Sequence, residues 1–272
     1  MCTVLGVARS TYYKSFDKTK SAREIENEEL KAAIIRIYKS NKGIYGAPRI
    51  HYILSTEGFT VSLKRVQRKM SELGLYAITV KKYKPHSNKK VKDGLENVLK
   101  RDFTTTSINQ KWVGDITYIH TTQDGWCYLA SVLDLYSKKI IGYAFGKKMT
   151  DDLVIKALKR AYYNQNPHKD NKLIFHSDLG SQYTSNDLKD LCKEFSIVQS
   201  FSKKGCPYDN ACIESFHSSI KKEEVYRNTY RTFEEAKIAI FKYIEGWYNR
   251  RRLHSAINYM TPEQCELSAR SV

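Results

Sequence analysis

Three strand-like segments follow one another between residues 111 and 146, and this succession constrains the fold more than any other feature. All three are rich in the aromatic and β-branched side chains that strands favour, and they span residues 111–121, 126–136 and 138–146. Asp124-Gly125 is typical of a hairpin turn, and Ser137 lies at a second tight connection. The segments therefore predict three consecutive antiparallel strands.

Helical and strand-like patterns alternate after residue 150. Two acids open a helical pattern at 151–165, and a short strand, "KLIFHSD", then ends at Asp178. A helix that Ser185 can cap, a strand "SIVQSFS" and a helix starting near Asp209 complete the series. This order predicts an α/β fold with a mixed five-stranded sheet and helices, over residues 103–265 with the C-terminal helices included.

Residues 1–78 predict a small all-α region that binds DNA. A helical module spans 24–76, where Ser62 can cap a helix whose outward positions carry Lys64, Arg65 and Arg68. Two short helices joined by a tight turn, the second with a basic face, fit a helix-turn-helix, although a basic face can also simply be solvated. Residues 1–15 read as the remainder of a truncated helix-turn-helix or as an ordinary terminus. The lysine-rich segment 79–102 predicts a basic linker.

The distribution of charge indicates a polyanionic partner. The formal net charge is +17, and residues 1–100 hold 21 basic against 9 acidic side chains. The sequence contains no run of about 18 apolar residues, so no membrane span or membrane partner is expected. The six cysteines form no CxxC pair, which predicts reduced thiols in a cytoplasmic protein.

Three carboxylates occupy positions where a mixed sheet converges. Asp115 lies within the first strand, Asp178 just past the fourth, and Glu214 in the first turns of the helix after the fifth. Burying lone charges is costly, and three that meet would repel one another unless a cation joined them. Mg²⁺ or Mn²⁺ prefers such oxygen ligands, and two ions can activate an attacking oxygen and stabilise a leaving one. The alternative is three unrelated surface acids.

Several neighbouring residues are candidates for supporting roles. His176 and Gln182 flank Asp178 and can position DNA or water, with local packing as the alternative. Asn210 is expected to cap or orient the helix that carries Glu214. Three lysines are candidates for holding phosphates at the site: Lys203, Lys204 and Lys221. The run Arg250–Arg252 with His254 is either a DNA contact or a solvated turn.

The segments "WVGDITYI", "HSDLGSQYTS" and "KKGCPYDNACIESFHSSIKKE" resemble the core of DDE transposases of the retroviral-integrase-like superfamily. They most resemble the second-frame protein of bacterial insertion sequences of the IS-three type. Thirty-five residues separate Asp178 from Glu214, as in the DD(35)E pattern of that group, and Lys221 matches a basic position typical of it. The resemblance extends to "YGAPRIHYIL" and to "GWYNRRRLHSAINYMTPEQ", so it covers nearly the whole chain.

The resemblance implies an RNase H-like integrase core in which Asp115, Asp178 and Glu214 are catalytic metal ligands for two Mg²⁺ or Mn²⁺ ions. It implies cleavage at insertion-sequence ends and transfer of the 3′-hydroxyl to target DNA, in a homo-oligomer on DNA associated with the bacterial nucleoid. The implied protein partner is a first-frame protein or a frameshift fusion. No N-terminal zinc module is present in the sequence. A catalytically inactive DNA-binding regulator and an RNase H-like nuclease are the alternatives.

Overall fold

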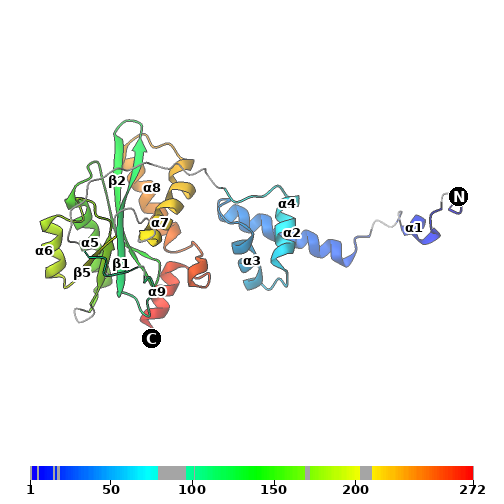
Figure 1. Cartoon of the computed structure of the whole chain (residues 1–272). Coiled ribbons are helices and arrows are strands. Elements are labelled where there is room, and N and C mark those ends of the chain that lie inside the picture. Colours follow the sequence, from blue (N-terminus) through cyan, green and yellow to red (C-terminus); the bar gives the residue numbers. More distant parts are fainter. Residues whose placement is uncertain are drawn as a thin grey trace. The chain divides into compact units, whose positions relative to one another are not determined.

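The computed structural model describes residues 2–4, 6–14, 16, 19–78, 96–100, 102–168, 172–202 and 210–271. The chain forms two compact units, Met1–Ile78 and Thr79–Val272, which are drawn in Figure 1. Lys203, Lys204 and most of the predicted linker lie outside the described residues. In the described part of the chain, no helix is both long and apolar enough to cross a membrane.

The described residues of the first unit form the helices α1 (Arg9–Lys14), α2 (Ala22–Ser40), α3 (Ala47–Thr56) and α4 (Leu63–Glu72). Apolar side chains of α2, α3 and α4 pack together, among them Ile34, Ile50 and Val66, each with 0 % exposure. Since these side chains recur at helical spacing, burying them against one another holds the three helices as one module.

Local signals fix where these helices begin. The Ser21 hydroxyl accepts the Glu24 N–H and the Glu24 carboxylate accepts the Ser21 N–H, which is a capping box. Ser62 caps α4 as predicted, because its hydroxyl accepts the N–H of Arg65. These bonds satisfy backbone donors that the first turn of a helix leaves free.

The second unit is built on a five-stranded sheet of order β3-β2-β1-β4-β5. Its strands are β1 (Lys111–Thr121), β2 (Gly125–Asp134), β3 (Ile140–Gly146), β4 (Ile174–Ser177) and β5 (Val198–Phe201). The first three strands pair antiparallel, whereas β4 and β5 run parallel to β1. The predicted mixed five-stranded sheet is therefore confirmed.

The turn between β2 and β3 shortens both strands relative to the prediction. The buried Asp134 carboxylate accepts the backbone N–H groups of Tyr136 and Ser137 and the Ser137 hydroxyl. It also accepts the N–H of Asn109. Because these bonds fold residues 135–139 into a turn, β2 ends at Asp134 and β3 begins only at Ile140.

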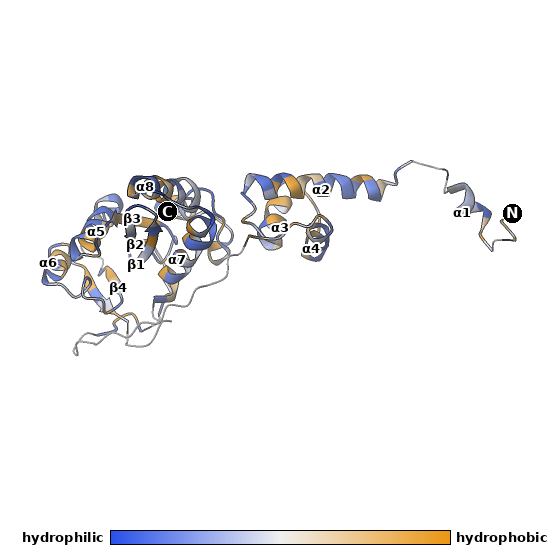
Figure 2. Cartoon of the chain, turned by 90° about the horizontal axis from the view of Figure 1, so that it is seen from above, coloured by the Kyte–Doolittle hydropathy of each residue, from blue (hydrophilic) through white to orange (hydrophobic). Residues whose placement is uncertain are grey.

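Helices cover both faces of this sheet, as Figures 1 and 2 show. On one face, α5 (Asp151–Gln165) and α6 (Asn186–Glu194) bury a core that includes Trp112, Phe175 and Leu188. On the other face, α7 (Ala211–Glu223) packs on β1 and β2. Side chains alternate between the two faces along a strand, so Asp115 lies on the opposite face from Trp112, toward α7.

The C-terminal part follows α7 through η2 (Val225–Arg227) and α8 (Phe233–Phe241), which runs directly into the π-helical turn η3 (Lys242–Tyr248). The short η4 (Ser255–Ile257) and α9 (Pro262–Arg270) complete it. The cysteines within the described residues are all free thiols, as predicted.

Candidate active site

Asp115 lies within β1, and Asp178 directly follows β4, the parallel strand beside it. The register of β1 and β4 pairs Val113 with His176, and each aspartate lies two residues beyond its member of that pair. β4 ends at Ser177 and its pairing with β1 ends at His176, so Asp178 lies just past the carboxyl end of β4, beside the strand that carries Asp115. The topology therefore brings together the first two predicted site residues.

Tyr183 lies close to both aspartates. Burial raises the pKa of its hydroxyl well above the ordinary tyrosine value, and the negative charges of Asp115 and Asp178 raise it further. Both carboxylates therefore act on the same buried phenol. The stretch of Tyr183, Gln182 and Gly180 forms one wall of the candidate site.

Asp115 is only partly buried, with a side-chain exposure of 24 %. Its Oδ1 accepts the N–H of Ile116 at 2.8 Å, and its Oδ2 lies 3.3 Å from Nδ1 of His217 on α7. His217 is buried, and its Nε2 has no hydrogen-bond partner among the described residues. The sequence analysis missed His217, although its place one helical turn after Glu214 could have indicated it.

The loop after Asp178 wraps around its carboxylate. Oδ1 of Asp178 accepts the N–H of Gly180 at 3.0 Å. A Cβ on Gly180 would lie 2.9 Å from this oxygen and 3.2 Å from Oε1 of Gln182, so a larger residue here would displace one of these two side chains. The Gln182 amide also donates to the Met149 carbonyl at 3.3 Å. Gln182 therefore lies beside Asp178, where the sequence analysis expected it to act.

Glu214 and Lys221 are carried by α7. Glu214 is exposed in the first turn, and Lys221 lies two turns later, where burial lowers its pKa and the charge of Asp115 opposes that change. No three His, Cys, Asp or Glu side chains are grouped to hold a metal ion within the described ranges. The aspartates are thus brought together, but Glu214 does not complete a three-ligand cluster with them.

Asn210 orients the start of α7 without capping it. It occupies the N-cap position, but its side chain makes no capping hydrogen bond. Instead its Nδ2 donates to the carbonyl of Gly114 at 3.2 Å, next to Asp115 in β1. This bond ties the helix that carries Glu214 to the strand that carries Asp115.

His176 is fully buried, and both of its ring nitrogens contact serine hydroxyls. Nδ1 lies 2.9 Å from Oγ of Ser200, and Nε2 lies 3.0 Å from Oγ of Ser202. These contacts join β4 to β5 and support the packing alternative for His176.

The basic candidates divide into exposed and paired side chains. On α4, Lys64 and Arg68 are exposed, whereas Arg65 bonds to the side chains of Glu26 and Asn27 in its own unit. Arg252, from the predicted C-terminal basic cluster, is buried and ion-paired with Glu223. Arg252 is therefore neither a DNA contact nor a solvated turn residue, because its guanidinium is buried and paired with the Glu223 carboxylate.

Family models match both units of the chain. Residues 24–83 match an HTH-like domain, and residues 105–207 and 196–262 match two models of the integrase core domain. The fold and the matches together define an integrase-core protein with an N-terminal helix-turn-helix-like domain, and the predicted fold class is confirmed.

Curated relatives specify the family. The chain is 37 % identical to the transposase InsF for insertion sequence IS3A of Escherichia coli (strain K12), covering 98 % of this chain and 92 % of the relative. It is 38 % identical to the transposase for insertion sequence element IS904 of Lactococcus lactis subsp. lactis (strain IL1403), covering 90 % and 96 %. The chain therefore belongs to the IS3 family of insertion-sequence transposases.

Viral integrases are similar among solved structures. The magnesium complex of the HTLV-2 integrase catalytic core domain has 17 % identity and a TM-score of 0.44, covering 58 % of this chain and 96 % of that chain. The simian T-cell lymphotropic virus intasome with the PP2A regulatory subunit B56 gamma has 15 % identity and a TM-score of 0.46, covering 86 % and 74 %.

Proposed function

We propose that this chain is a polynucleotidyl transferase that cleaves DNA at insertion-sequence ends and transfers the resulting 3′-hydroxyl to target DNA. The observation that carries the proposal is the placement of Asp115 within β1 and of Asp178 directly after β4, the parallel strand beside it. Two acids held close together are costly to keep unless their charges serve a ligand. Family membership supports the same activity.

The donor chemistry of the site fits a hard divalent cation. Asp115 and Asp178 supply only oxygen ligands, and Mg²⁺ is commonly held by one or two carboxylates, with water and substrate phosphates as the remaining ligands. Asp115, Asp178 and Glu214 would hold two Mg²⁺ or Mn²⁺ ions in the complex with DNA. Bound ions would supply Lewis-acid activation of the attacking oxygen and charge compensation at the leaving oxygen.

The protein groups around the carboxylates have separate roles in this proposal. His217 holds Oδ2 of Asp115, and the Gly180 N–H holds Oδ1 of Asp178, so both carboxylates are oriented before DNA arrives. Lys221, close enough to interact with Asp115, contacts a phosphate next to the reacting bond. Lys203 and Lys204 are proposed to contact phosphates of the same strand.

The first unit is proposed to recruit the DNA ends. Lys64 and Arg68 are exposed on α4, where they would contact phosphates, while the bonds of Arg65 to Glu26 and Asn27 orient the helix. Assembly as a homo-oligomer on paired ends, together with a first-frame protein or as a frameshift fusion, belongs to the same proposal.

Amide substitutions of the three acids test the chemistry. Asp115→Asn, Asp178→Asn and Glu214→Gln should each abolish Mg²⁺-dependent cleavage and strand transfer on a terminal-repeat duplex, while binding of the duplex persists. Asp187→Asn, at an exposed acid of α6, is the matched control and should retain activity. Normal strand transfer by Asp178→Asn would refute the assignment. If the wild-type protein binds the duplex but forms no product, the chain is a regulator. If it cleaves the duplex but forms no strand-transfer product, the chain is a nuclease.

A further inference from the structure

An aromatic surface lies on the hairpin that carries Asp115. Residues 111–113 of β1 pair with β4, and residues 128–133 of β2 pair with β3, so β1 and β2 continue as a two-stranded ribbon beyond Tyr118 and Tyr128. Tyr118 is paired with Tyr128 across this ribbon, and His120 is paired with Trp126, so all four rings project from one face. These four residues are called the hairpin aromatic cluster.

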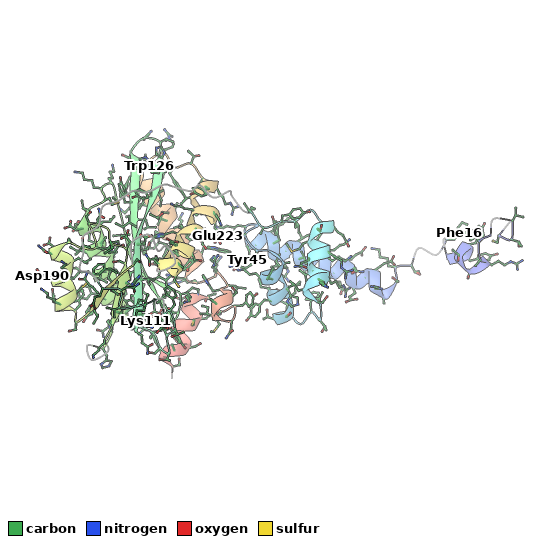
Figure 3. All side chains as sticks on the ribbon, viewed as in Figure 1. Phe16, Tyr45, Lys111, Trp126, Asp190 and Glu223 are labelled. Atoms are coloured by element: carbon green, nitrogen blue, oxygen red, sulfur yellow. The ribbon has the colours of Figure 1, made fainter. Side chains whose placement is uncertain are left out.

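The rings of the cluster contact one another edge to face. The ring centroids lie 5.5 Å apart for Tyr118 and Tyr128, 6.4 Å for Tyr118 and Trp126, and 5.0 Å for His120 and Trp126. Tyr118 is 44 % exposed and Trp126 is 58 % exposed. Edge-to-face packing fixes the rings while leaving ring surface open, and Figure 3 shows Trp126 near the end of the hairpin.

A short series of contacts connects this cluster to the candidate active site. The Tyr118 hydroxyl donates to Sδ of Met149 at 3.7 Å, and the Met149 carbonyl accepts the Gln182 amide at 3.3 Å. Gln182 Oε1 and Asp178 Oδ1 both border Gly180. The cluster lies on the face of β1 opposite Asp115, and these contacts link it to Asp178 around the edge of β1 beyond the residues that pair with β4.

An exposed cation follows the strand that borders the cluster. Tyr128 is opposite Gly146, the last residue of β3, and the exposed Lys148 comes two residues later, whereas Lys147 is ion-paired with Asp124 and lies over the ring of Phe233. Rings and a nearby cation match the two parts of a nucleotide, because bases stack on aromatic rings and phosphates attract cations. A protein partner that recognised apolar surface alone would gain nothing from Lys148.

We propose that the hairpin aromatic cluster stacks unpaired nucleobases of a DNA end that has opened next to Asp115 and Asp178. This inference deepens the proposed function and rests on it for the position of the DNA end. Unpaired bases offer both faces for stacking, whereas a duplex covers every base face except the outer face of its terminal pair. Stacking on the cluster would hold the opened strand away from the acids, so that its partner strand can enter.

Trp126 offers a direct probe of this contact. The chain has three tryptophans, and Trp112 and Trp247 are buried, with exposures of 0 % and 6 %. We compare a blunt duplex with a duplex of the same length whose last three base pairs are mismatched, using the full chain without divalent metal. The frayed duplex should quench tryptophan fluorescence and bind more tightly than the blunt one, and Trp126→Phe should keep the tighter binding but lose the quenching.

Truncation of the rings should remove only the preference for unpaired bases. Trp126→Ala and Tyr118→Ala should each weaken binding of the frayed duplex by roughly five- to a hundredfold and leave blunt-duplex binding unchanged. Tyr163→Ala is the matched control, because Tyr163 is 68 % exposed on α5, and its neighbour Asn164 bonds to Ile141 at the opposite end of β3. A normal melting temperature shows that each variant is folded.

Three outcomes would overturn the inference. They are equal binding of both duplexes by the wild type, equal losses on both duplexes in the ring variants, and a change of oligomeric state as the only effect of Trp126→Ala. The last would identify the cluster as a contact between copies of the chain. Repeating the binding measurement with Asp178→Asn separates this inference from the proposed function, because the preference for frayed DNA should survive without catalysis.

Discussion

Nδ1 of His217 lies 3.3 Å from Oδ2 of Asp115, so a buried imidazole on α7 holds a carboxylate in the middle of β1. A carboxylate oxygen accepts hydrogen bonds, so a hydrogen bond across this contact would take its proton from Nδ1. The second oxygen of Asp115 is fixed by the N–H of Ile116. Both oxygens of this acid thus have defined partners before any metal or DNA is bound.

Removing the imidazole should weaken the metal site without unfolding the protein. We expect His217→Ala to raise the Mg²⁺ concentration for half-maximal strand transfer, or to lower the rate, by about 10- to 100-fold, which is typical for loss of a group that orients a ligand. His217→Asn places an amide donor near the Nδ1 position and should recover part of the loss. A Mg²⁺ titration of both variants measures this, and an unchanged titration in His217→Ala would refute a positioning role.

Charge reversal on α4 should separate DNA contacts from structural pairs. Lys64→Glu with Arg68→Glu should weaken duplex binding and reduce the slope of log K against log salt by about one unit for each lost phosphate contact. Arg65→Ala should instead lower the melting temperature of the helical unit, since it breaks the bonds to Glu26 and Asn27. Binding of the double variant that equals wild type across a salt series would mean that these two side chains are only solvated.

Breaking the buried pair of Glu223 and Arg252 should be strongly destabilising. The Glu223 carboxylate accepts bonds from Arg252, Tyr243 and Trp247, which joins α7 to η3 and the segment after it. Arg252→Ala would leave the buried carboxylate without its cation and should cost about 3–5 kcal/mol of unfolding free energy. Urea unfolding measures this loss, with Arg250→Ala as the control because Arg250 is 62 % exposed.

The same pair predicts a pH dependence of stability. Burial raises the pKa of Glu223, but the charge and hydrogen bonds of Arg252 outweigh it, and the net pKa lies below the ordinary glutamate value. A carboxyl whose pKa is lowered on folding stabilises the protein above its unfolded pKa, and this contribution is lost as pH falls through the folded pKa. The wild type should therefore lose stability below about pH 4.3 more steeply than Glu223→Gln in urea unfolding. Parallel pH profiles would contradict this assignment.

Two glycines should respond oppositely to an added methyl group. A Cβ at Gly142 would lie 2.5 Å from the backbone nitrogen of Ala161 and against the carbonyl of Ala157, so α5 would have to move off β3. Gly142→Ala should cost at least about 1–3 kcal/mol, as overpacking does. Gly246→Ala meets nothing within 4 Å and should be neutral or stabilising by up to about 1 kcal/mol. Equal melting temperatures of the two variants would show that the close approach is not rigid.

Local patterns in the sequence determined most of the elements and the fold class. Ser62 and Ser185 mark helix starts because their hydroxyls satisfy free backbone donors, and β1 has the bounds that its aromatic and β-branched residues predicted. These signals act between residues close in the chain, so they can be read without a structure. The resemblance of three segments to DDE transposases added the family, which the relatives confirm.

The tertiary structure alone decided which side chains meet. Three sets of contacts depend on the order of the strands and on how the helices pack: His217 with Asp115, Arg252 with Glu223, and His176 with its two serines. The residues next to each of them in the sequence do not indicate these contacts. The sequence showed Arg252 only as one arginine in a basic run, because burial is a property of the packed chain. The hairpin aromatic cluster likewise exists only through the register of β1 and β2, which brings four rings from two strands onto one face.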